Sequence, residues 1–185
     1  MIIGLCGPAG AGKNTVADHL CYRHGYTQLA FADPVYRAVS AATGIPVREL
    51  QNRSNKEAEI DWLGVSPRYL LQTLGTEWGR QSVRDDIWVQ IAMRKVDGME
   101  PRHVVLTDVR FENEAAAIKA RGGVIWRVVR RGDGCLSRDA AGHASEAGVP
   151  DILVDSVISN CGTLSDLRAA TDDAIRRLDA CKMTV

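Results

Sequence analysis

The chain of 185 residues has no excess of charge of either sign, because 23 basic side chains are balanced by 23 acidic ones. This balance argues against a nucleic-acid or acidic-lipid partner. Long hydrophobic runs are also missing, so no stretch is expected to cross a membrane, and the residues before Gly7 do not form a signal peptide. The five cysteines are scattered and form no C-x-x-C pair. We therefore expect reduced thiols, no zinc site and a cytoplasmic protein.

Short apolar runs alternate with amphipathic segments along the chain. Apolar runs predict strands over residues 1–6, 27–31, 103–108, 124–129 and 152–158. Helical periodicity, N-caps and helix-starting prolines predict helices over residues 13–24, 33–43, 66–83, 85–96, 111–121 and 163–180. Strands separated by helices predict an α/β fold, in which a parallel sheet of about five strands is covered by helices on both faces. At this length we expect a single domain.

The stretch GPAGAGKN, from Gly7 to Asn14, nearly matches the phosphate-binding P-loop G-x-x-x-x-G-K-[ST]. It lies between a predicted strand and a predicted helix, which is the context that a P-loop requires. Its glycines let the backbone aim N–H groups at phosphate oxygens, and Lys13 can reach the terminal phosphates. The alternative is a glycine turn that only packs helix against strand. The predicted nucleotide-binding residues are Gly7, Ala9, Gly10, Ala11, Gly12, Lys13, Asn14 and Thr15.

Asn14 stands where the hydroxyl of a Ser or Thr usually ligates Mg²⁺. An amide is a poorer ligand for a hard cation, but Mg²⁺ usually keeps several waters, so the loss of one direct ligand is tolerable. Thr15 supplies a hydroxyl one position later. The order G-K-x-T is similar to the G-K-G-T of adenylate kinase and indicates kinase chemistry on a small molecule.

A second apolar run, from Val104 to Asp108, ends in an acidic residue in the manner of a Walker B strand. Asp108 is therefore a candidate Mg²⁺ ligand together with Asn14 and Thr15, and the alternative is an N-cap for the next helix. The following residue is Val109, not a glutamate that would activate water, which argues against a hydrolysing ATPase. Arg110 can bind an acceptor phosphate through two hydrogen bonds.

Five motifs in this order resemble those of the phage-type deoxynucleoside monophosphate kinases. They are GPAGAGKNTVA, FADP, LLQTLGTEWGR, TDVRFENEA and HASE, and the resemblance extends from Ile3 to about Asn160. The family often has Asp in place of Asn14. The resemblance implies a P-loop NTPase-type three-layer sandwich that moves the γ-phosphate of ATP to a deoxynucleoside monophosphate, with Mg²⁺ as cofactor. It implies one kinase domain over residues 1–185, with a monophosphate-binding helical region at about 33–97 and a lid at about 130–149.

The resemblance also implies roles for residues outside the loop. Catalytic roles fall to Lys13, Asp33, Arg110 and Arg130. ATP would also contact Arg131 and Asn160. The acceptor would contact Asp33, Arg37, Arg68, Thr76, Glu77, Trp78, Arg80, Arg110, His143 and Glu146. Three alternatives stay open: Asp33 as a plain helix N-cap, Trp78 as a core side chain, and residues 130–149 as a solvated charged loop.

Other functions compete with this interpretation. A dephospho-coenzyme A kinase would have a similar fold, but the TLGTEWGR motif argues against it. A regulatory GTPase switch needs an N-K-x-D motif, whereas Asn55-Lys56 is followed by Glu57 and Ala58. A nucleic-acid-binding module is disfavoured by the neutral charge. We expect a small-molecule nucleotide as the partner, no nucleic acid and no membrane, in the host cytoplasm if the chain is phage-encoded, and we leave open whether the protein is a homodimer.

Overall fold

The computed structural model describes residues 1–52, 56–99, 103–130 and 149–182. The chain divides into two units, which we describe one at a time. Unit 1 comprises Met1–Ala30 and Val96–Val185, and unit 2 comprises Phe31–Lys95. Within the described ranges, no helix combines the length and the apolar character needed to cross a membrane.

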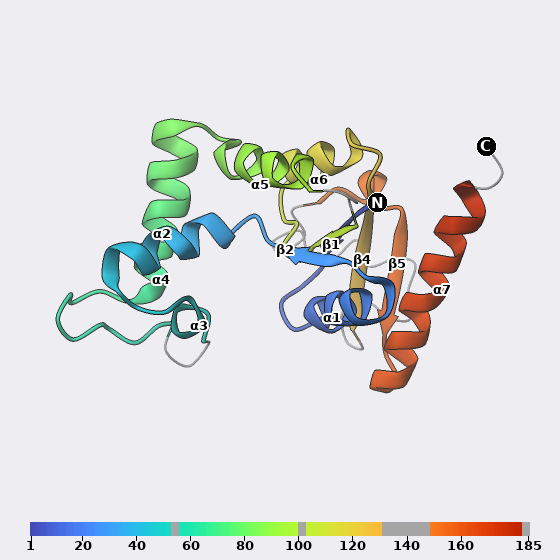
Figure 1. The fold of residues 1–185 in the computed structure, drawn as a ribbon. Coiled ribbons are helices and arrows are strands. Elements are labelled where there is room, and N and C mark those ends of the chain that lie inside the picture. Colours follow the sequence, from blue (N-terminus) through green and yellow to red (C-terminus); the bar gives the residue numbers. More distant parts are fainter. Residues whose placement is uncertain (53–55, 100–102, 131–148, 183–185) are drawn as a thin grey trace. The chain divides into compact units, whose positions relative to one another are not determined.

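Unit 1 is built on a five-stranded sheet in the order β2-β3-β1-β4-β5 (Figure 1). The strands are β1 (Ile2–Cys6), β2 (Thr27–Leu29), β3 (Val104–Leu106), β4 (Val124–Arg130) and β5 (Ser156–Asn160). All four neighbouring pairs are parallel, as the sequence pattern predicted. The central strand β1 is buried at every position, which explains why its residues are almost all apolar.

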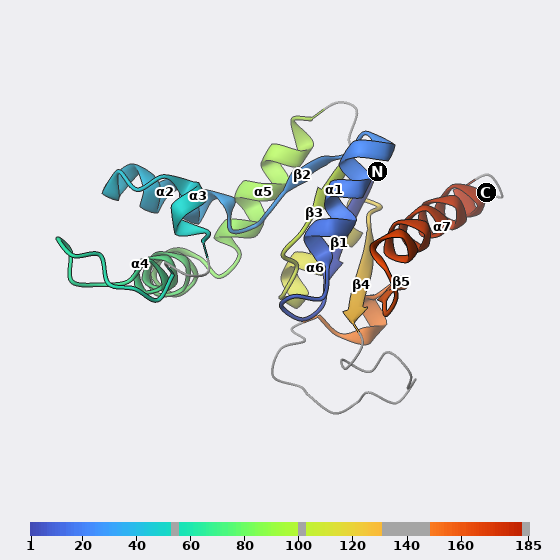
Figure 2. The same ribbon diagram turned by 90° about the horizontal axis from the view of Figure 1, so that it is seen from below.

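Helices cover both faces of this sheet (Figures 1 and 2). On one face, α1 (Lys13–His24) and α7 (Leu164–Lys182) contact each other, and their apolar side chains form a core with Ile3 and Leu5 of β1. Gly4 points to the opposite face, where a Cβ would lie 2.7 Å from the end of Ile118 in α6 (Glu112–Lys119). The alternation along β1 thus separates two helical layers and confirms the predicted three-layer sandwich.

Unit 2 is helical. It contains α2 (Asp33–Thr43), the short α3 (Val47–Leu50), α4 (Pro67–Gln72), the π-helix η1 (Thr73–Val83) and most of α5 (Ile87–Asp97). The predicted start at Ser66 is confirmed, because its side chain accepts a hydrogen bond from the Tyr69 N–H at 3.3 Å. The predicted single helix over residues 66–83 instead changes its hydrogen-bond pattern after Gln72.

The π-helix η1 is built around the side chain of Trp88. Gly79 is buried, and a Cβ on it would lie 2.5 Å from the Trp88 ring. The Trp88 Nε1–H donates to the carbonyl oxygen of Gly75 at 2.7 Å. The indole therefore packs against the helix backbone where glycine leaves space for it. The helix propensities of these residues predict a helix here. They do not determine whether each N–H bonds the carbonyl four residues earlier, as in an α-helix, or five residues earlier, as in a π-helix.

Two further expectations are wrong. The predicted strand over residues 152–158 begins later, because Asp151–Leu153 form a 3₁₀ turn, η2, and Ile152 is 92% exposed. Cys6 and Cys21 are free thiols as expected, but Cys161 is disulfide-bonded. The spacing of the cysteines in the sequence does not predict that bond, because disulfide formation depends on which thiols the fold brings within reach.

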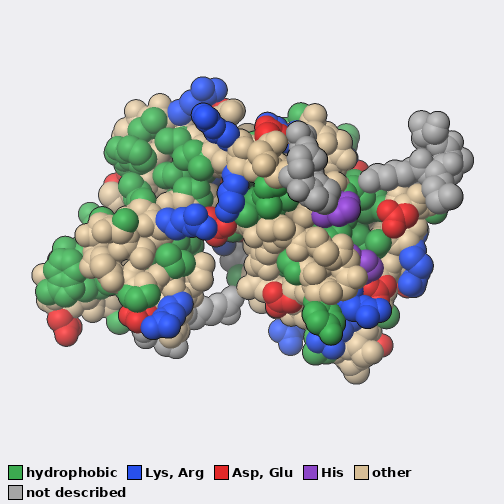
Figure 3. All heavy atoms as spheres, in the orientation of Figure 1, with side chains coloured by type: hydrophobic (Ala, Val, Ile, Leu, Met, Phe, Trp, Pro, Cys, Tyr) green, Lys and Arg blue, Asp and Glu red, His purple; other side chains and the backbone are tan. Residues whose placement is uncertain are grey.

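On the face shown in Figure 3, basic and acidic side chains are interspersed.

Candidate functional site

The P-loop connects β1 to α1, and its shape requires glycine at two places. Gly7 has φ 122° and Gly12 has φ 108°, a region of backbone conformation that residues with a side chain rarely adopt. A Cβ on Gly7 would lie 2.3 Å from the Val128 carbonyl oxygen, and one on Gly12 would lie 2.6 Å from Nδ2 of Asn160. The loop is thus folded tightly against the ends of β4 and β5.

Lys13, the first residue of α1, reaches back over this loop. Its Nζ donates to the carbonyl oxygens of Gly7 at 2.7 Å and Pro8 at 2.8 Å. Asn14 is exposed on the first turn of α1, and Thr15 beside it is half-buried. The lysine ammonium and the positive end of the helix dipole therefore lie together at the loop, which is the arrangement that binds phosphate.

Two predicted residues from distant parts of the chain meet the loop. Asn160, at the end of β5, donates from Nδ2 to the Ala11 carbonyl oxygen at 2.8 Å. Arg130, at the end of β4, donates from Nη1 to the carbonyl oxygen of Gly10 at 3.5 Å. Asn160 holds the backbone of the loop, while Arg130 brings a second positive charge to it.

Asp108 lies at the same edge of the sheet. The next residue, Val109, donates its N–H to the Leu5 carbonyl oxygen at 3.2 Å, which places Asp108 beside the strand that leads into the P-loop. The alternative role of Asp108 as a helix N-cap is wrong, because α6 begins at Glu112 and Phe111 occupies the N-cap position. The Asp108 side chain is half-buried at this edge, where the carboxyl ends of the parallel strands lie.

Glu114 does the capping that was the alternative role considered for Asp108. The side chain of Glu114 is buried, and its Oε2 accepts hydrogen bonds from the N–H groups of Arg110 at 2.7 Å and Phe111 at 3.1 Å. This contact fixes the backbone of Arg110, whose side chain is exposed. The sequence signal that could have found it is the acidic residue at the third position of the helix, which is typical of a capping box.

Cys6 and Arg127 are two residues near the loop that the sequence analysis did not assign. Burial raises the pKa of the Cys6 thiol, while the nearby Arg127 guanidinium and the Lys13 ammonium oppose that shift. Arg127 also forms an ion pair with Asp151 and donates to the Val149 carbonyl oxygen at 2.7 Å. A raised pKa keeps Cys6 a neutral thiol, which suits a buried strand end and not a nucleophile.

The predicted acceptor residues of unit 2 are placed on α2, α4 and η1. The alternative role of Asp33 as an N-cap is wrong: Asp33 is the first residue inside α2, and Ala32 precedes it at the N-cap. Arg37 is exposed one turn later. Arg68 is exposed and forms an ion pair with Glu57. Arg80 donates from Nη1 to the Asp85 carbonyl oxygen at 3.0 Å.

Three acceptor candidates lie in succession on η1: Thr76, Glu77 and Trp78, all exposed. Trp78 is 50% exposed, and its ring is tilted against that of Trp88 with the centroids 6.3 Å apart. The alternative in which Trp78 is a core side chain is therefore wrong. The Trp78 ring thus lies beside a second indole while half of the side chain remains accessible.

Other predicted residues lie outside the part of the chain that the structure describes. They are Arg131, His143 and Glu146, and the predicted lid at about 130–149 falls there too, apart from its two end residues.

Comparisons with known proteins place the chain among kinases. A family model described as deoxynucleotide monophosphate kinase matches residues 46–170. A protein of Acanthamoeba polyphaga mimivirus named as a deoxynucleotide monophosphate kinase is 32% identical over 184 residues, covering 90% of this chain and 91% of the viral protein. A deoxynucleoside-5′-monophosphate kinase of Escherichia phage T5 is 28% identical over 182 residues, covering 64% of this chain and 72% of that protein.

The solved structures support the fold. Dephospho-CoA kinase from Campylobacter jejuni superposes with a TM-score of 0.50 over 98% of both chains, at 14% identity. A likeness at that identity concerns the fold alone.

Proposed function

Because the chain belongs to the deoxynucleotide monophosphate kinase family, we propose that it transfers the γ-phosphate of ATP to a deoxynucleoside 5′-monophosphate. The observation that carries this proposal is the arrangement of charged side chains around the P-loop of unit 1. Lys13 and Arg130 both bond the loop backbone, and Asp108 lies beside the strand that enters it. The residues 1–185 are proposed to act as one kinase domain, with the monophosphate bound by a region at about 33–97.

The donor side is assigned to the loop and its two supports. The N–H groups from Gly7 to Thr15 would surround the β- and γ-phosphates, and the Lys13 ammonium would exchange its carbonyl partners for phosphate oxygens. Arg130 would add positive charge where the transferring phosphoryl group carries negative charge. Asn160 would act through the loop, because its amide holds the Ala11 backbone.

The residues at this edge also fit Mg²⁺. A carboxylate from Asp108 and a hydroxyl from Thr15 are the oxygen donors that this ion prefers, and the exposed Asn14 carbonyl oxygen offers a third. Bound there, the ion would supply charge neutralisation for the phosphates. Asp108 is the ligand on which the assignment mainly depends, since it is a carboxylate beside the strand that leads into the loop.

The acceptor side is assigned to Arg110 and to exposed or half-buried residues of unit 2. The unit 2 residues are Asp33, Arg37, Arg68, Thr76, Glu77, Trp78 and Arg80. Arg68 is free to change partner at little cost, because an exposed ion pair such as Arg68–Glu57 contributes at most about 1 kcal/mol. Trp78 offers the accessible indole face on which a base can stack. π-helices such as η1 often occur at functional sites.

The proposed reaction needs no strong general base. The monophosphate oxygen is already a nucleophile near neutral pH, so a bond forms from that oxygen to the γ-phosphorus as the bond to the β-phosphate oxygen of ATP breaks, and ADP leaves. The protein contributes position and positive charge. Arg131, His143 and Glu146 keep the roles that the family resemblance implies, as part of the same proposal. The reaction is proposed to take place in the cytoplasm, which is that of the host if the chain is phage-encoded.

An acceptor survey tests the proposal. Tag-free protein is incubated with ATP and Mg²⁺ together with each deoxynucleoside monophosphate, each ribonucleoside monophosphate, dephospho-coenzyme A or no acceptor. Products are separated by anion exchange. We expect a deoxynucleoside diphosphate and ADP in equal amounts. Phosphorylation of dephospho-coenzyme A alone would reassign the substrate, and binding of ATP without transfer to any acceptor would point to a regulatory nucleotide-binding protein.

A further inference from the structure

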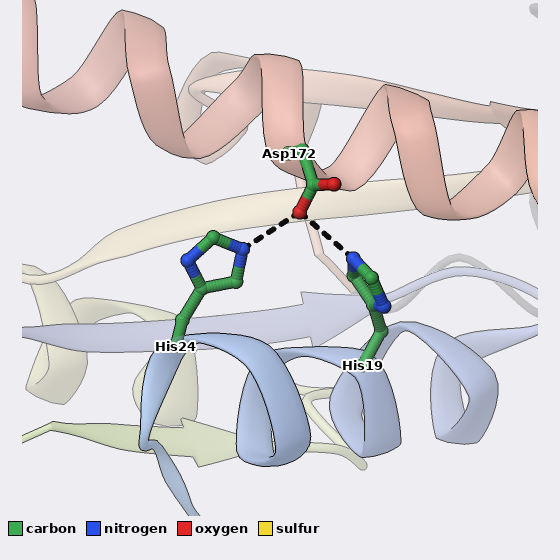
Figure 4. A group of neighbouring side chains, drawn as sticks. All are labelled: His19, His24 and Asp172. Carbon is green, nitrogen blue, oxygen red and sulfur yellow. Dashed lines mark hydrogen bonds and ion pairs between the residues drawn. The ribbon is translucent and has the colours of Figure 1, made fainter.

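Two histidines and an aspartate that the kinase chemistry does not use meet between α1 and α7 (Figure 4). His19 and His24 belong to α1, and Asp172 lies near the middle of α7. The Asp172 Oδ1 is 2.8 Å from the His19 Nε2 and 2.7 Å from the His24 Nε2. The three side chains converge on one point from two helices that pack together.

The surroundings hold these side chains in place. The side chain of His19 is 9% exposed, that of His24 is 25% exposed and that of Asp172 is 30% exposed. Thr171 and Ala174, on either side of Asp172 in α7, are buried. The cluster therefore lies at the rim of the core, where its ligand atoms are fixed by packed helices and still accessible to an ion with one or more waters.

We propose that His19, His24 and Asp172 form a binding site for a divalent transition-metal ion of the zinc class. The three ligand atoms lie within 4.8 Å of one another. Zn²⁺ binds imidazole nitrogen and carboxylate oxygen at about 2.0–2.2 Å, which sets tetrahedral ligands about 3.4 Å apart. The two bonded pairs, at 2.7 and 2.8 Å, would need to separate by only about 0.6 Å.

The ligand set distinguishes this site from a Mg²⁺ site. Mg²⁺ prefers oxygen ligands, whereas two imidazoles and one carboxylate suit zinc and its neighbours in the first transition series. The site is also separate from the P-loop, because its α1 ligands lie toward the other end of the helix that begins at Lys13. A bound ion would join α1 to α7 and stabilise the fold without taking part in phosphoryl transfer.

Metal binding must compete with the hydrogen bonds now present. Each Nε2 shares a hydrogen bond with the Asp172 carboxylate, whereas a metal needs the lone pair of each Nε2. A neutral ring can meet that demand by carrying its proton on Nδ1, and a charged ring must release a proton. Zinc binding therefore has to displace the hydrogen bonds that Asp172 shares with both rings.

Calorimetric titration with ZnCl₂ tests the site in tag-free protein without nucleotide. We expect one ion to bind the wild type. His24→Gln and Asp172→Asn should each weaken that affinity at least tenfold. Asp173→Asn is the matched control, because Asp173 is next to Asp172 but pairs with Arg176 on the exposed side of α7. His103→Gln controls for loss of a histidine elsewhere, and both controls should stay within twofold of the wild type.

Thermal unfolding gives a second readout. Zinc should raise the Tm of the wild type and of both controls, and should not raise that of His24→Gln or Asp172→Asn. His19→Gln replaces either variant if one fails to fold. Absence of zinc binding by the wild type, or equal affinity across the site variants and the controls, would overturn the proposal. Loss of zinc binding in Cys21→Ser with full binding in Asp172→Asn would also overturn it, because the ion would then belong to a thiol.

Discussion

Lys13 is held by two carbonyl oxygens of the loop that it is proposed to serve. These bonds keep the ammonium at the loop before nucleotide arrives, so less side-chain entropy has to be lost on binding. The two hydrogen bonds thus fix the otherwise flexible Lys13 side chain with its positive charge at the loop.

Replacement of this side chain gives the clearest prediction at the residue scale. Lys13→Ala should lower kcat at least about a hundredfold, or about 2.7 kcal/mol in transition-state stabilisation, because the charge cannot be replaced from the loop backbone. The measurement is steady-state ADP release with a deoxynucleoside monophosphate as acceptor. Lys95→Ala removes an exposed lysine of α5 and should leave kcat within twofold. A Lys13→Ala enzyme with more than a tenth of wild-type kcat would remove Lys13 from the mechanism.

Single residues were predictable where a local motif defines them and not where a distant contact does. The P-loop from Gly7 to Thr15 follows from spacing alone. The hydrogen bond from Asn160 to Ala11 joins residues far apart in sequence. No pattern in the sequence near Asn160 indicates which atom of the loop its amide will bond. The His19–His24–Asp172 cluster was missed for the same reason, because its ligands come from helices at opposite ends of the chain.

Among the elements, η1 depends on two glycines with different surroundings. A Cβ on Gly79 would lie 2.5 Å from Cζ2 of Trp88, whereas one on Gly75 would meet Val35 at an ordinary 3.6 Å. The two positions therefore form a matched pair for testing why this segment is a π-helix.

Gly79→Ala should destabilise the protein and Gly75→Ala should not. Overpacking against a buried ring typically costs 1–3 kcal/mol, so the urea midpoint of Gly79→Ala should fall by roughly that free energy. Gly75→Ala should be neutral or slightly stabilising, because alanine has the higher helix propensity. Equal effects of the two changes on the free energy of unfolding would contradict the role given to Trp88.

The start of α7 carries a pH-dependent contribution. Thr163 and Asp166 exchange hydrogen bonds: the Asp166 Oδ2 accepts from the Thr163 N–H at 2.7 Å and from its hydroxyl at 2.8 Å. The Asp166 N–H in turn donates to the Thr163 hydroxyl oxygen at 3.2 Å. The hydrogen bonds from Thr163 lower the pKa of Asp166, because they favour the charged carboxylate.

A lowered folded-state pKa means that Asp166 stabilises the fold above the ordinary carboxyl pKa of about 4. That contribution is lost as the pH falls through the lowered pKa. Asp166→Asn should therefore lower the urea midpoint at pH 7, and the difference from the wild type should shrink in acid. Urea titrations at a series of pH values check this. A difference that grows as the pH falls would contradict the sign of the shift.

Most elements were predicted from periodicity and capping signals, and the misses have physical causes. α1 and α2 have the predicted bounds because a glycine stops each one. The π-helix and the late start of β5 were missed because tertiary packing decided the first and the turn after Pro150 decided the second. Apolar residues in that turn imitate a strand, although Ile152 is exposed.

For the molecule as a whole, the equal numbers of basic and acidic side chains predict weak interaction with nucleic acid. Fluorescence anisotropy with labelled single-stranded DNA at physiological salt should give a Kd weaker than about 100 µM, since a chain of zero net charge gains little from the phosphate backbone. Binding that is tighter and strongly salt-dependent would show a basic surface that the net charge conceals.

The three-layer fold and the family were both predictable, because short buried strands, a P-loop and family motifs reinforce one another. The sequence resemblance to deoxynucleoside monophosphate kinases is confirmed by the family match over residues 46–170. The assignment of side chains to acceptor and donor remains a prediction, since motif order does not determine where a side chain points.

The central position of β1 has a consequence for synthesis in the cell. Ile3 pairs with Val105 on one side and with Val124 on the other, so β1 has both neighbours only after the chain has been synthesised as far as β4. At about 5–20 residues per second, an apolar strand waits on the order of ten seconds for its partners. During that interval the unpaired, apolar β1 is a segment to which a chaperone can bind.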